Sequence, residues 1–390
     1  MVLRFLLIVF MTSVACGQDR KIKETLNPGC EKCGDDKTLM YIRADGPVDT
    51  MHVVWEFTNG VPCFMFLISD LNSSLVFKWN DSKIVDISCN STAKFALVNW
   101  IYKLYEYNDT DDMGYMTAHS PYHSYSLEHV TWSRASHVVS DKEVTLHING
   151  HYRHKPGTIA VKLQYLPFTD YAKDLPHLIH TANSTLVDIS LVNLTASRDF
   201  NSSRFALDLA LMASDIQQQD SLHYVTRKSL DDEHTPGVFE IIEIKTPKSY
   251  NGDEGGFLQF RPVAYTDPKR EVSSSTNVRM SPFNVTSAMK ASPFHSVGVF
   301  KDYKYDVWGL QSIVSFGLSG DGFYQKHNYT AWSYTAGYGA PPLEGFSLFV
   351  TIIISIGLGV PVLLALSGII YVIVRRYKQR NAPQRFTDDE

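Results

Sequence analysis

One segment near the C-terminus constrains this chain more than any other. Phe346 to Val374 form an uncharged and almost wholly apolar run of 29 residues. As an α-helix the run would be about 43 Å long, against roughly 30 Å of membrane hydrocarbon, so tilting or a bend at Pro361 has to absorb the excess. Four basic residues follow between Arg375 and Arg380, and the positive-inside rule places them in the cytosol. The sequence therefore predicts a transmembrane helix over residues 346–374 and a cytosolic tail over residues 375–390.

The N-terminus has the pattern of a secretory signal peptide. Arg4 precedes the apolar run Phe5 to Phe10, and Ala15-Cys16-Gly17 gives the small-x-small pattern of a cleavage site. An uncleaved anchor is the alternative, but the apolar run is short for a membrane span. We therefore expect residues 1–17 to be removed, leaving a type I single-pass protein with residues 18–345 in a luminal or extracellular space.

Glycosylation sequons support the same topology. The chain has sixteen asparagines, and chance would place Ser or Thr two positions later in about two or three of them. Nine sequons occur, all in the expected luminal part: Asn72, Asn80, Asn90, Asn108, Asn183, Asn193, Asn201, Asn284 and Asn328. We expect most of these asparagines to carry glycans.

The cysteines fit an oxidising compartment. Without Cys16, the chain keeps Cys30, Cys33, Cys63 and Cys89, an even number within its first quarter. Cys63 can bond Cys89 while the other two pair locally, or each can bond one member of the local pair. We favour Cys63 with Cys89, because both lie at edges of strand-like runs. A redox pair or a zinc site is the alternative, but the sequence lacks a strand-to-helix context and a second close cysteine pair.

The expected luminal part is mainly β. Apolar residues alternate with polar or small residues in four stretches, as strands with one buried face require: Val144–Ile148, Ile159–Tyr165, Val187–Leu191 and Phe205–Leu209. Asn149-Gly150 has the chemistry of a hairpin turn. The pattern breaks between Pro167 and Ser184. We therefore expect two luminal antiparallel β-sandwich-like domains, residues 18–170 and 171–345, followed by the membrane helix.

Composition and motifs argue against several functions. Lys plus Arg number 36 against 41 Asp plus Glu, and no basic run occurs before residue 375, so we expect no nucleic-acid partner. The densest ionisable cluster, Asp231 to His234, is too local for a catalytic triad. The chain has no P-loop, dinucleotide fingerprint or Gly-x-Ser-x-Gly elbow. We therefore expect no catalytic residue and no cofactor.

Histidines are the candidate metal ligands. A solvated surface is the simpler interpretation for each group, so we expect no metal. The groups are His147 with His151 and His154, His119 with His123, and His177 with His180.

Four stretches resemble the glycosylated lysosomal membrane protein family. They are Ser120 to Trp132, Ser229 to Phe239, Phe260 to Tyr265 and Tyr329 to Ser333, and their order and spacing match as well. The resemblance extends from about residue 40 to the end of the membrane helix. There, Gly357-x-Gly359-x-Pro361 is similar to the Gly/Pro helix centre of the family.

The resemblance implies a heavily N-glycosylated lysosomal membrane protein that is not an enzyme. It implies an accessory subunit that binds a multi-pass transporter of the major facilitator superfamily and shields it from luminal proteases. A luminal hydrolase and a cell-surface adhesion or receptor module are the alternatives. A homodimer of the luminal body stays open.

Two features depart from the family. Its members carry cysteines mainly in their second half, whereas this chain has none beyond Cys89, so a disulfide assignment cannot be transferred. The tail lacks a Tyr-x-x-hydrophobic sorting signal, because Arg380 stands three residues after Tyr377. We therefore expect a partner to supply the sorting signal.

The predicted membrane helix has one face of small residues. Gly357, Pro361, Ala365 and Gly368 are spaced four, four and three residues apart, so they share a face. Small residues allow another helix to approach closely, although Gly and Pro are also simply tolerated in membrane spans. With a multi-pass partner implied by the resemblance, we expect this face to pack against that partner.

Overall fold

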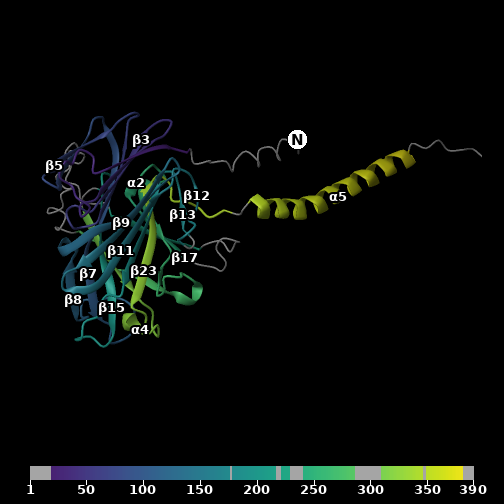
Figure 1. Ribbon diagram of the computed structural model, residues 1–390. Coiled ribbons are helices and arrows are strands. Elements are labelled where there is room, and N and C mark those ends of the chain that lie inside the picture. The colour runs from purple at the N-terminus through teal and green to yellow at the C-terminus, as the bar shows by residue number, and fades with distance from the viewer. Residues whose placement is uncertain are drawn as a thin grey trace, which may run out of the picture. The chain divides into compact units, whose positions relative to one another are not determined.

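The computed structural model describes residues 19–175, 178–216, 221–228, 240–285, 309–345 and 348–380. The chain divides into two compact units, a body that ends at Leu343 and a unit from Glu344 onward that contains the C-terminal helix (Figure 1). The body consists almost entirely of antiparallel strands. The expectation of a mainly β chain with one C-terminal apolar helix is confirmed.

The first layer of the body has the strand order β1-β2-β3-β4-β7-β15-β22. Two short strands, β8 and β21, add to β7 and β22. Their bounds are β1 (Lys21–Leu26), β2 (Leu39–Asp45), β3 (Thr50–Glu56), β4 (Cys63–Ser69), β7 (Ala93–Asn108), β8 (Tyr122–Ser126), β15 (Ser203–Ala213), β21 (Asn284–Val285) and β22 (Gly309–Phe316).

The second layer has the order β9-β10-β11-β14-β23-β18-β17-β16. A link between the layers is made by β20, which pairs with β22 of the first layer and with β19, a neighbour of β23. The bounds are β9 (Val130–Ser140), β10 (Glu143–Tyr152), β11 (Lys155–Tyr165), β14 (Ser184–Val192), β16 (His223–Lys228), β17 (Glu240–Lys245), β18 (Gly256–Phe260), β19 (Val263–Tyr265), β20 (Ser275–Met280) and β23 (Tyr329–Tyr338).

Small elements complete the body. Two hairpins stand apart from the main layers, β5 (Leu75–Asn80) with β6 (Lys83–Cys89), and β12 (Asp170–Tyr171) with β13 (Ile179–His180). The short helices are η1 (Leu127–His129), α2 (Pro247–Tyr250), η2 (Val272–Ser274) and α4 (Phe323–His327).

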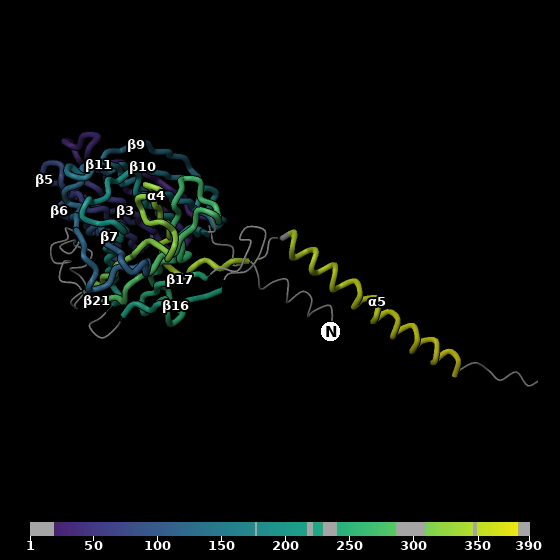
Figure 2. Tube along the Cα trace, turned by 90° about the horizontal axis from the view of Figure 1, so that it is seen from below, coloured from purple at the N-terminus to yellow at the C-terminus, as the bar shows by residue number. Residues whose placement is uncertain are grey.

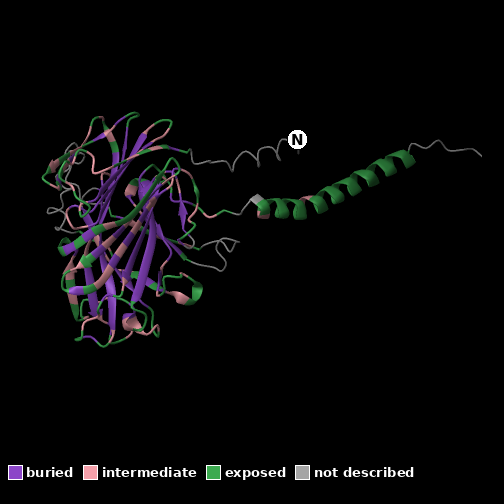
Figure 3. Ribbon diagram, in the orientation of Figure 1, coloured by how far each residue is buried: buried purple, intermediate pink, exposed green. Residues whose placement is uncertain are grey.

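The main core lies between the two layers, where Figure 3 shows the buried residues. Trp55 and Phe66 of the first layer belong to the same buried cluster as Leu146 and Trp332 of the second. Burial of such apolar side chains is the dominant favourable contribution to folding. The four predicted alternating stretches all place their apolar residues in this cluster, so those strand predictions are confirmed.

The division expected at residue 170 does not separate two compact units. Residues on both sides of it belong to one unit and bury side chains in one core. Within the sheets, β7 pairs with β15 and β11 pairs with β14. The break between Pro167 and Ser184 is a local connection that contains the β12–β13 hairpin, and its Leu175 and Leu178 pack on Leu186.

The turn predicted at Asn149-Gly150 is wrong. Both residues lie inside β10, and the chain turns at Arg153 and His154 instead. Gly150 is required for a different reason, because a Cβ there would lie 2.5 Å from Cζ3 of Trp132. The ring of Trp132 therefore packs directly on the backbone of the neighbouring strand.

The second unit contains one long helix, α5 (Leu348–Arg380). Within its span Phe349–Arg380, the most apolar window of 18 residues has a mean hydropathy of 2.6, and none of that window is buried within the chain. The helix passes Pro361 without interruption and continues six residues beyond the predicted end at residue 374. The expected signal peptide, residues 1–17, lies outside the described residues.

Candidate functional site

A polar cavity of about 360 Å³ opens between β8, the β10–β11 turn and the segment after β14. Its lining includes His123, Tyr125, His154, Lys155 and Ser197. A cavity of this size is within the range of small-molecule sites. Its chemistry therefore decides whether it is a candidate for catalysis.

A buried ion pair lies beside this cavity. Nζ of Lys155 is 2.5 Å from Oε2 of Glu106, and the Glu106 side chain is fully buried in β7. The same carboxylate accepts hydrogen bonds from the backbone N–H of Ser197, at 2.6 Å, and from the hydroxyls of Ser203 and Tyr125. These donors and Nζ of Lys155 together engage both oxygens of the buried carboxylate. Glu106 therefore joins β7 to β8, to β11, to β15 and to the segment after β14, and has little capacity left for a substrate.

Ser197, His123 and Asp199 meet at the cavity but lack the geometry of a catalytic triad. Oγ of Ser197 is 3.3 Å from Nε2 of His123, and Oδ2 of Asp199 is 3.4 Å from the same nitrogen. A triad needs the nucleophile and the acid on opposite ring nitrogens, so that the acid orients the base. Here both contacts fall on Nε2. This arrangement cannot activate Ser197 by the usual relay.

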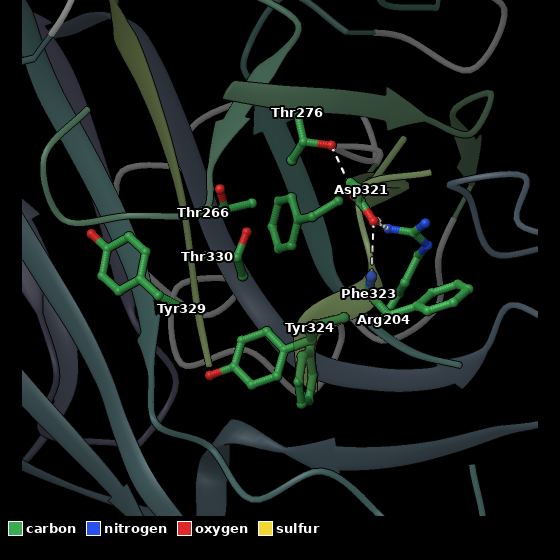
Figure 4. A pocket seen from close by; sticks show the side chains of 10 residues that line it. Arg204, Thr266, Thr276, Asp321, Phe323, Tyr324, Tyr329 and Thr330 are labelled. Atoms are coloured by element: carbon green, nitrogen blue, oxygen red, sulfur yellow. Dashed lines mark hydrogen bonds and ion pairs between the residues drawn. The ribbon is translucent and has the colours of Figure 1, made fainter. Parts of the chain in front are cut away.

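A second polar centre surrounds Arg204 of β15 (Figure 4). Its guanidinium binds Asp109 at 2.7 Å, Asp112 at 2.6 Å and Asp321 at 2.7 Å. The carbonyl of Leu318 accepts one further hydrogen bond, so the donors of Arg204 are engaged. These contacts join β15 to the connections that follow β7 and β22.

The pKa of Asp321 shows that this centre stabilises an ionised carboxylate. Burial raises the pKa of Asp321, but hydrogen bonds from Arg204 and from backbone N–H groups outweigh it, and the pKa is lowered. The adjacent cavity, lined by Thr266 and Thr330 in Figure 4, has a volume of only about 20 Å³. That is room for about one water molecule. The Arg204 centre is therefore a structural clamp.

The candidate ligands and acids from the sequence do not converge. Asp231 to His234 and His177 lie outside the described residues. Among the residues that are described, no group of three His, Cys, Asp or Glu side chains is arranged to hold a metal. His147 and His151 lie on the outer face of β10, and His180 hydrogen-bonds the carbonyl of Phe168.

The cysteines confirm one predicted pair and overturn the other. Cys30 and Cys33 form a disulfide within a loop. The expected bond between Cys63 and Cys89 is wrong, because both are free thiols. Cys63 is buried in β4, where burial and the charge of Glu56 raise its pKa. Cys89, at the end of β6, packs against the apolar cluster that contains Cys63, and its Sγ is 3.6 Å from the hydroxyl of Ser91. Both thiols contribute packing in place of a bridge.

All nine sequon asparagines lie on the described body, and seven are exposed. Asn108 and Asn183 are half-buried. In each of them the side-chain oxygen is engaged, by the N–H of Ser202 at 3.1 Å and by Nε of Arg20 at 2.6 Å. A glycan attaches to the side-chain nitrogen, so these contacts leave the acceptor atom available. Occupancy of the nine sites stays a prediction.

The small-residue face of α5 is open within the chain. A Cβ added at Gly357 or Gly368 would meet no other atom within 4 Å, and Pro361 and Ala365 are exposed. Nothing in the described part of the chain covers this face.

Sequence reasoning missed the two buried polar centres. Glu106 and Arg204 stand in strands whose other residues are mostly buried. Burying a charged side chain at such a position costs free energy unless the charge is paired. This was the only signal of the two centres in the sequence. Their partners come from segments about 50 to 120 residues away, which periodicity does not show.

Comparison with known sequences assigns the family. The model of the family described as "Glycosylated lysosomal membrane protein" matches residues 38–379. The chain belongs to the glycosylated lysosomal membrane protein family. It is 26% identical to glycosylated lysosomal membrane protein B of Xenopus laevis, over 93% of this chain and 92% of that protein.

Other members of the family are about equally distant. The glycosylated lysosomal membrane protein of Homo sapiens is 26% identical, over 88% of this chain and 86% of its own length, and that of Danio rerio is 27% identical, over 92% and 89%. Membership in the glycosylated lysosomal membrane protein family supports a lysosomal membrane glycoprotein. The single apolar helix fits a single-pass member of that family.

Proposed function

We propose that this glycosylated lysosomal membrane protein is a non-enzymatic accessory subunit of a multi-pass transporter of the major facilitator superfamily. The body lies in the lysosomal lumen, and the residues after α5 lie in the cytosol. The subunit binds the transporter and protects its luminal side from proteases.

The observation that carries the proposal is the open small-residue face of α5. Gly357 and Gly368 leave space along the helix that nothing in the described chain fills. In a membrane, helices associate mainly through close packing of such faces. The hydrophobic effect does not drive this association, because lipid tails are as apolar as the helix surfaces. A multi-pass protein supplies several helices against which this face can pack.

The body supports a protective role. Few of its described residues lie in long loops, and its strands bury a large core between the layers and a second cluster against the β5–β6 hairpin. Glycans on the seven exposed sequon asparagines would cover part of its surface with sugar. Proteases need an exposed, mobile backbone to cleave, so a rigid and sugar-coated body over the luminal side of a transporter limits their access.

The proposal is tested by purifying the full-length chain from lysosomal membranes in mild detergent and identifying bound proteins by mass spectrometry. We expect one transporter of the major facilitator superfamily at near-stoichiometric yield. Depletion of this chain should shorten the lifetime of that transporter, and inhibitors of luminal proteases should restore it. Recovery of no multi-pass protein would refute the proposal.

A further inference from the structure

The cavity between β8, the β10–β11 turn and the segment after β14 lacks catalytic geometry, but its wall has the chemistry of a ligand site. The wall includes the hydroxyl groups of Ser124, Tyr125 and Ser197 and the imidazole rings of His123 and His154. Hydroxyl and imidazole groups donate and accept hydrogen bonds, and a tyrosine ring adds an apolar surface. Such a wall suits a compact ligand that carries several hydroxyl groups.

The charges of the wall favour a neutral ligand. Lys155 is the only lysine or arginine among the lining residues, and none of them is Asp or Glu. Nζ of Lys155 is already engaged, at 2.5 Å from Oε2 of Glu106 and at 3.3 Å from the hydroxyl of Tyr125. Phosphate and carboxylate ligands are bound most strongly by charged donors, and the wall has no lysine or arginine left for them. A sugar without charge therefore fits this wall better than an anion.

One glycosylation sequon includes a residue of the cavity wall. Thr195 lines the cavity and is also the third residue of the sequon Asn193-Leu194-Thr195. None of the other eight sequons includes a lining residue. Asn193 is exposed, and two residues of chain span at most about 7 Å. A glycan on Asn193 therefore begins beside the cavity.

The segment that carries this sequon is held in place on both sides. The N–H of Asn193 donates to the carbonyl of Asn328 at 2.7 Å, and the N–H of Thr195 donates to the carbonyl of Pro156 at 2.8 Å. A Cβ added at Gly157 would lie 2.5 Å from the carbonyl oxygen of Asn193, so the segment packs directly on the start of β11. Asn328 follows α4, and this end of the body faces the viewer in Figure 2. Because the attachment point is fixed, a sugar tethered there loses less freedom when it binds the wall.

We propose that the cavity binds carbohydrate and that its occupant is the inner part of the glycan attached to Asn193 of the same chain. Attachment beside the wall raises the effective concentration of the sugar in the cavity, so individually weak hydrogen bonds are enough to hold it. The bound sugar covers Lys155 where the cavity opens and limits the access of water to its ion pair with Glu106. The Asn193 glycan is thus an internal ligand of the body.

Release of the glycans from the native full-length protein by a peptide N-glycosidase, in mild detergent, tests the proposal. Asn328 is the matched control for Asn193, because both asparagines are exposed, have left-handed φ angles of 53° and 51°, and are in contact. We expect release from Asn193 to be at least tenfold slower than release from Asn328, measured at each site by mass spectrometry. After denaturation, both glycans should be released at the same rate.

Variants of the wall test whether the cavity causes this protection. Ser124→Ile and His154→Ala each remove a polar group from the wall, and both residues are exposed. Ser133→Ile on β9 and Arg153→Ala in the β10–β11 turn are the matched controls, because they change exposed residues outside the lining. We expect each wall variant to raise the rate of release from Asn193 at least fivefold and the controls to leave it unchanged. The melting temperature verifies folding, and one folded wall variant is sufficient for the comparison.

Three outcomes would each overturn the proposal. The first is a native protein without a glycan on Asn193. The second is release from Asn193 at the same rate as from Asn328, and binding of free N-acetylglucosamine by such a protein would assign the cavity to a soluble sugar instead. The third is unchanged protection of Asn193 in a folded wall variant, which would place the cause of the protection outside the cavity.

Discussion

At the scale of single residues, two buried titratable groups respond to acid in opposite directions. Glu56 of β3 is fully buried, and its Oε1 accepts hydrogen bonds from Thr58 at 2.5 Å and from the N–H of Asn59 at 2.9 Å. His52 of the same strand is also buried, with Nδ1 bonded to Tyr41 and Nε2 to Ser69, each at 2.8 Å. Because family membership places the protein in an acidic organelle, both groups bear on its stability there.

Glu56 favours the folded state in acid. Burial raises its pKa from 4.5 to about 7, so the folded chain holds a proton that the unfolded chain releases between these values. The stabilisation is complete below pH 4.5 and is lost as the pH rises through 7, a change of about 3 kcal/mol in the free energy of unfolding. We expect Glu56→Gln to flatten the pH profile of unfolding between these values, measured by thermal unfolding of the full-length chain. The exposed Glu240→Gln serves as control, and identical profiles for Glu56→Gln and wild type would contradict the assignment.

His52 has the opposite effect. Burial lowers its pKa from 6.5 to about 4, so its stabilising contribution is present above pH 6.5 and is lost as the pH falls toward 4, by about 3 kcal/mol in total. We expect His52→Gln to be less stable than wild type at neutral pH, because a buried hydrogen-bond network is disturbed, by about 1–3 kcal/mol. The difference should shrink as the pH falls from 6.5 to 4. A constant difference between the two unfolding curves over this range would show that His52 does not titrate.

At the scale of elements, α5 is the one helix in the described chain that is long and apolar enough to cross a membrane. The apolar side chains of the strands are buried in the body, whereas none of the most apolar stretch of α5 is buried. Glycine in a helix interior costs up to about 1 kcal/mol relative to alanine. The proposed contact with a membrane-embedded partner would account for the small residues of α5.

The small-residue face can be tested against a glycine on another face of the same helix. We expect Gly357→Leu with Gly368→Leu to reduce co-purification of the transporter at least several-fold, because the leucines prevent close helix packing. Gly359→Leu is the matched control, since two residues along an α-helix turn it by about 200° away from Gly357. The measurement is transporter recovery, with glycosylation and melting temperature of the body unchanged. Full recovery by the double variant would leave the body as the sole site of association.

At the scale of the whole molecule, the body is a two-layer sandwich whose predicted sugars are unevenly placed. Three sequons flank the β5–β6 hairpin. Others lie where strands end, as at Asn108, the last residue of β7, and at Asn193 after β14. The strands β9, β10 and β11 carry none. Two long stretches of the sequence, residues 109–182 and 202–283, contain no sequon.

Enzymatic removal of the glycans from the native protein should lower its apparent mass in several steps, because seven of the nine sequon asparagines are exposed. We expect the deglycosylated body to stay folded, since its core does not depend on sugar, but to be cleaved faster by lysosomal proteases at about pH 5. Gel mobility, melting temperature and cleavage rate measure the three effects. Unchanged mobility would contradict the luminal placement of the body, and an unchanged cleavage rate would contradict the protective role of the coat.

The sequence by itself determined the features that depend on neighbouring residues. Alternation along Ile159–Tyr165 predicted a strand with one buried face, and the apolar run from Phe346 predicted α5. The sequons are local patterns as well. Each of these follows from the geometry of one element, because side chains repeat every two residues in a strand and a membrane span needs about 20 apolar residues.

Only the tertiary structure decided how the strands combine. The pairing of β7 with β15 joins segments about 100 residues apart, and it turned two expected domains into one body. The same long-range packing left Cys63 and Cys89 unbonded and brought Lys155 to Glu106. Local periodicity shows that one face of a strand must be buried, but the face that covers it depends on the packing of the whole chain. For this protein, that packing alone decided which polar groups are paired in the interior and which strands remain open at the surface.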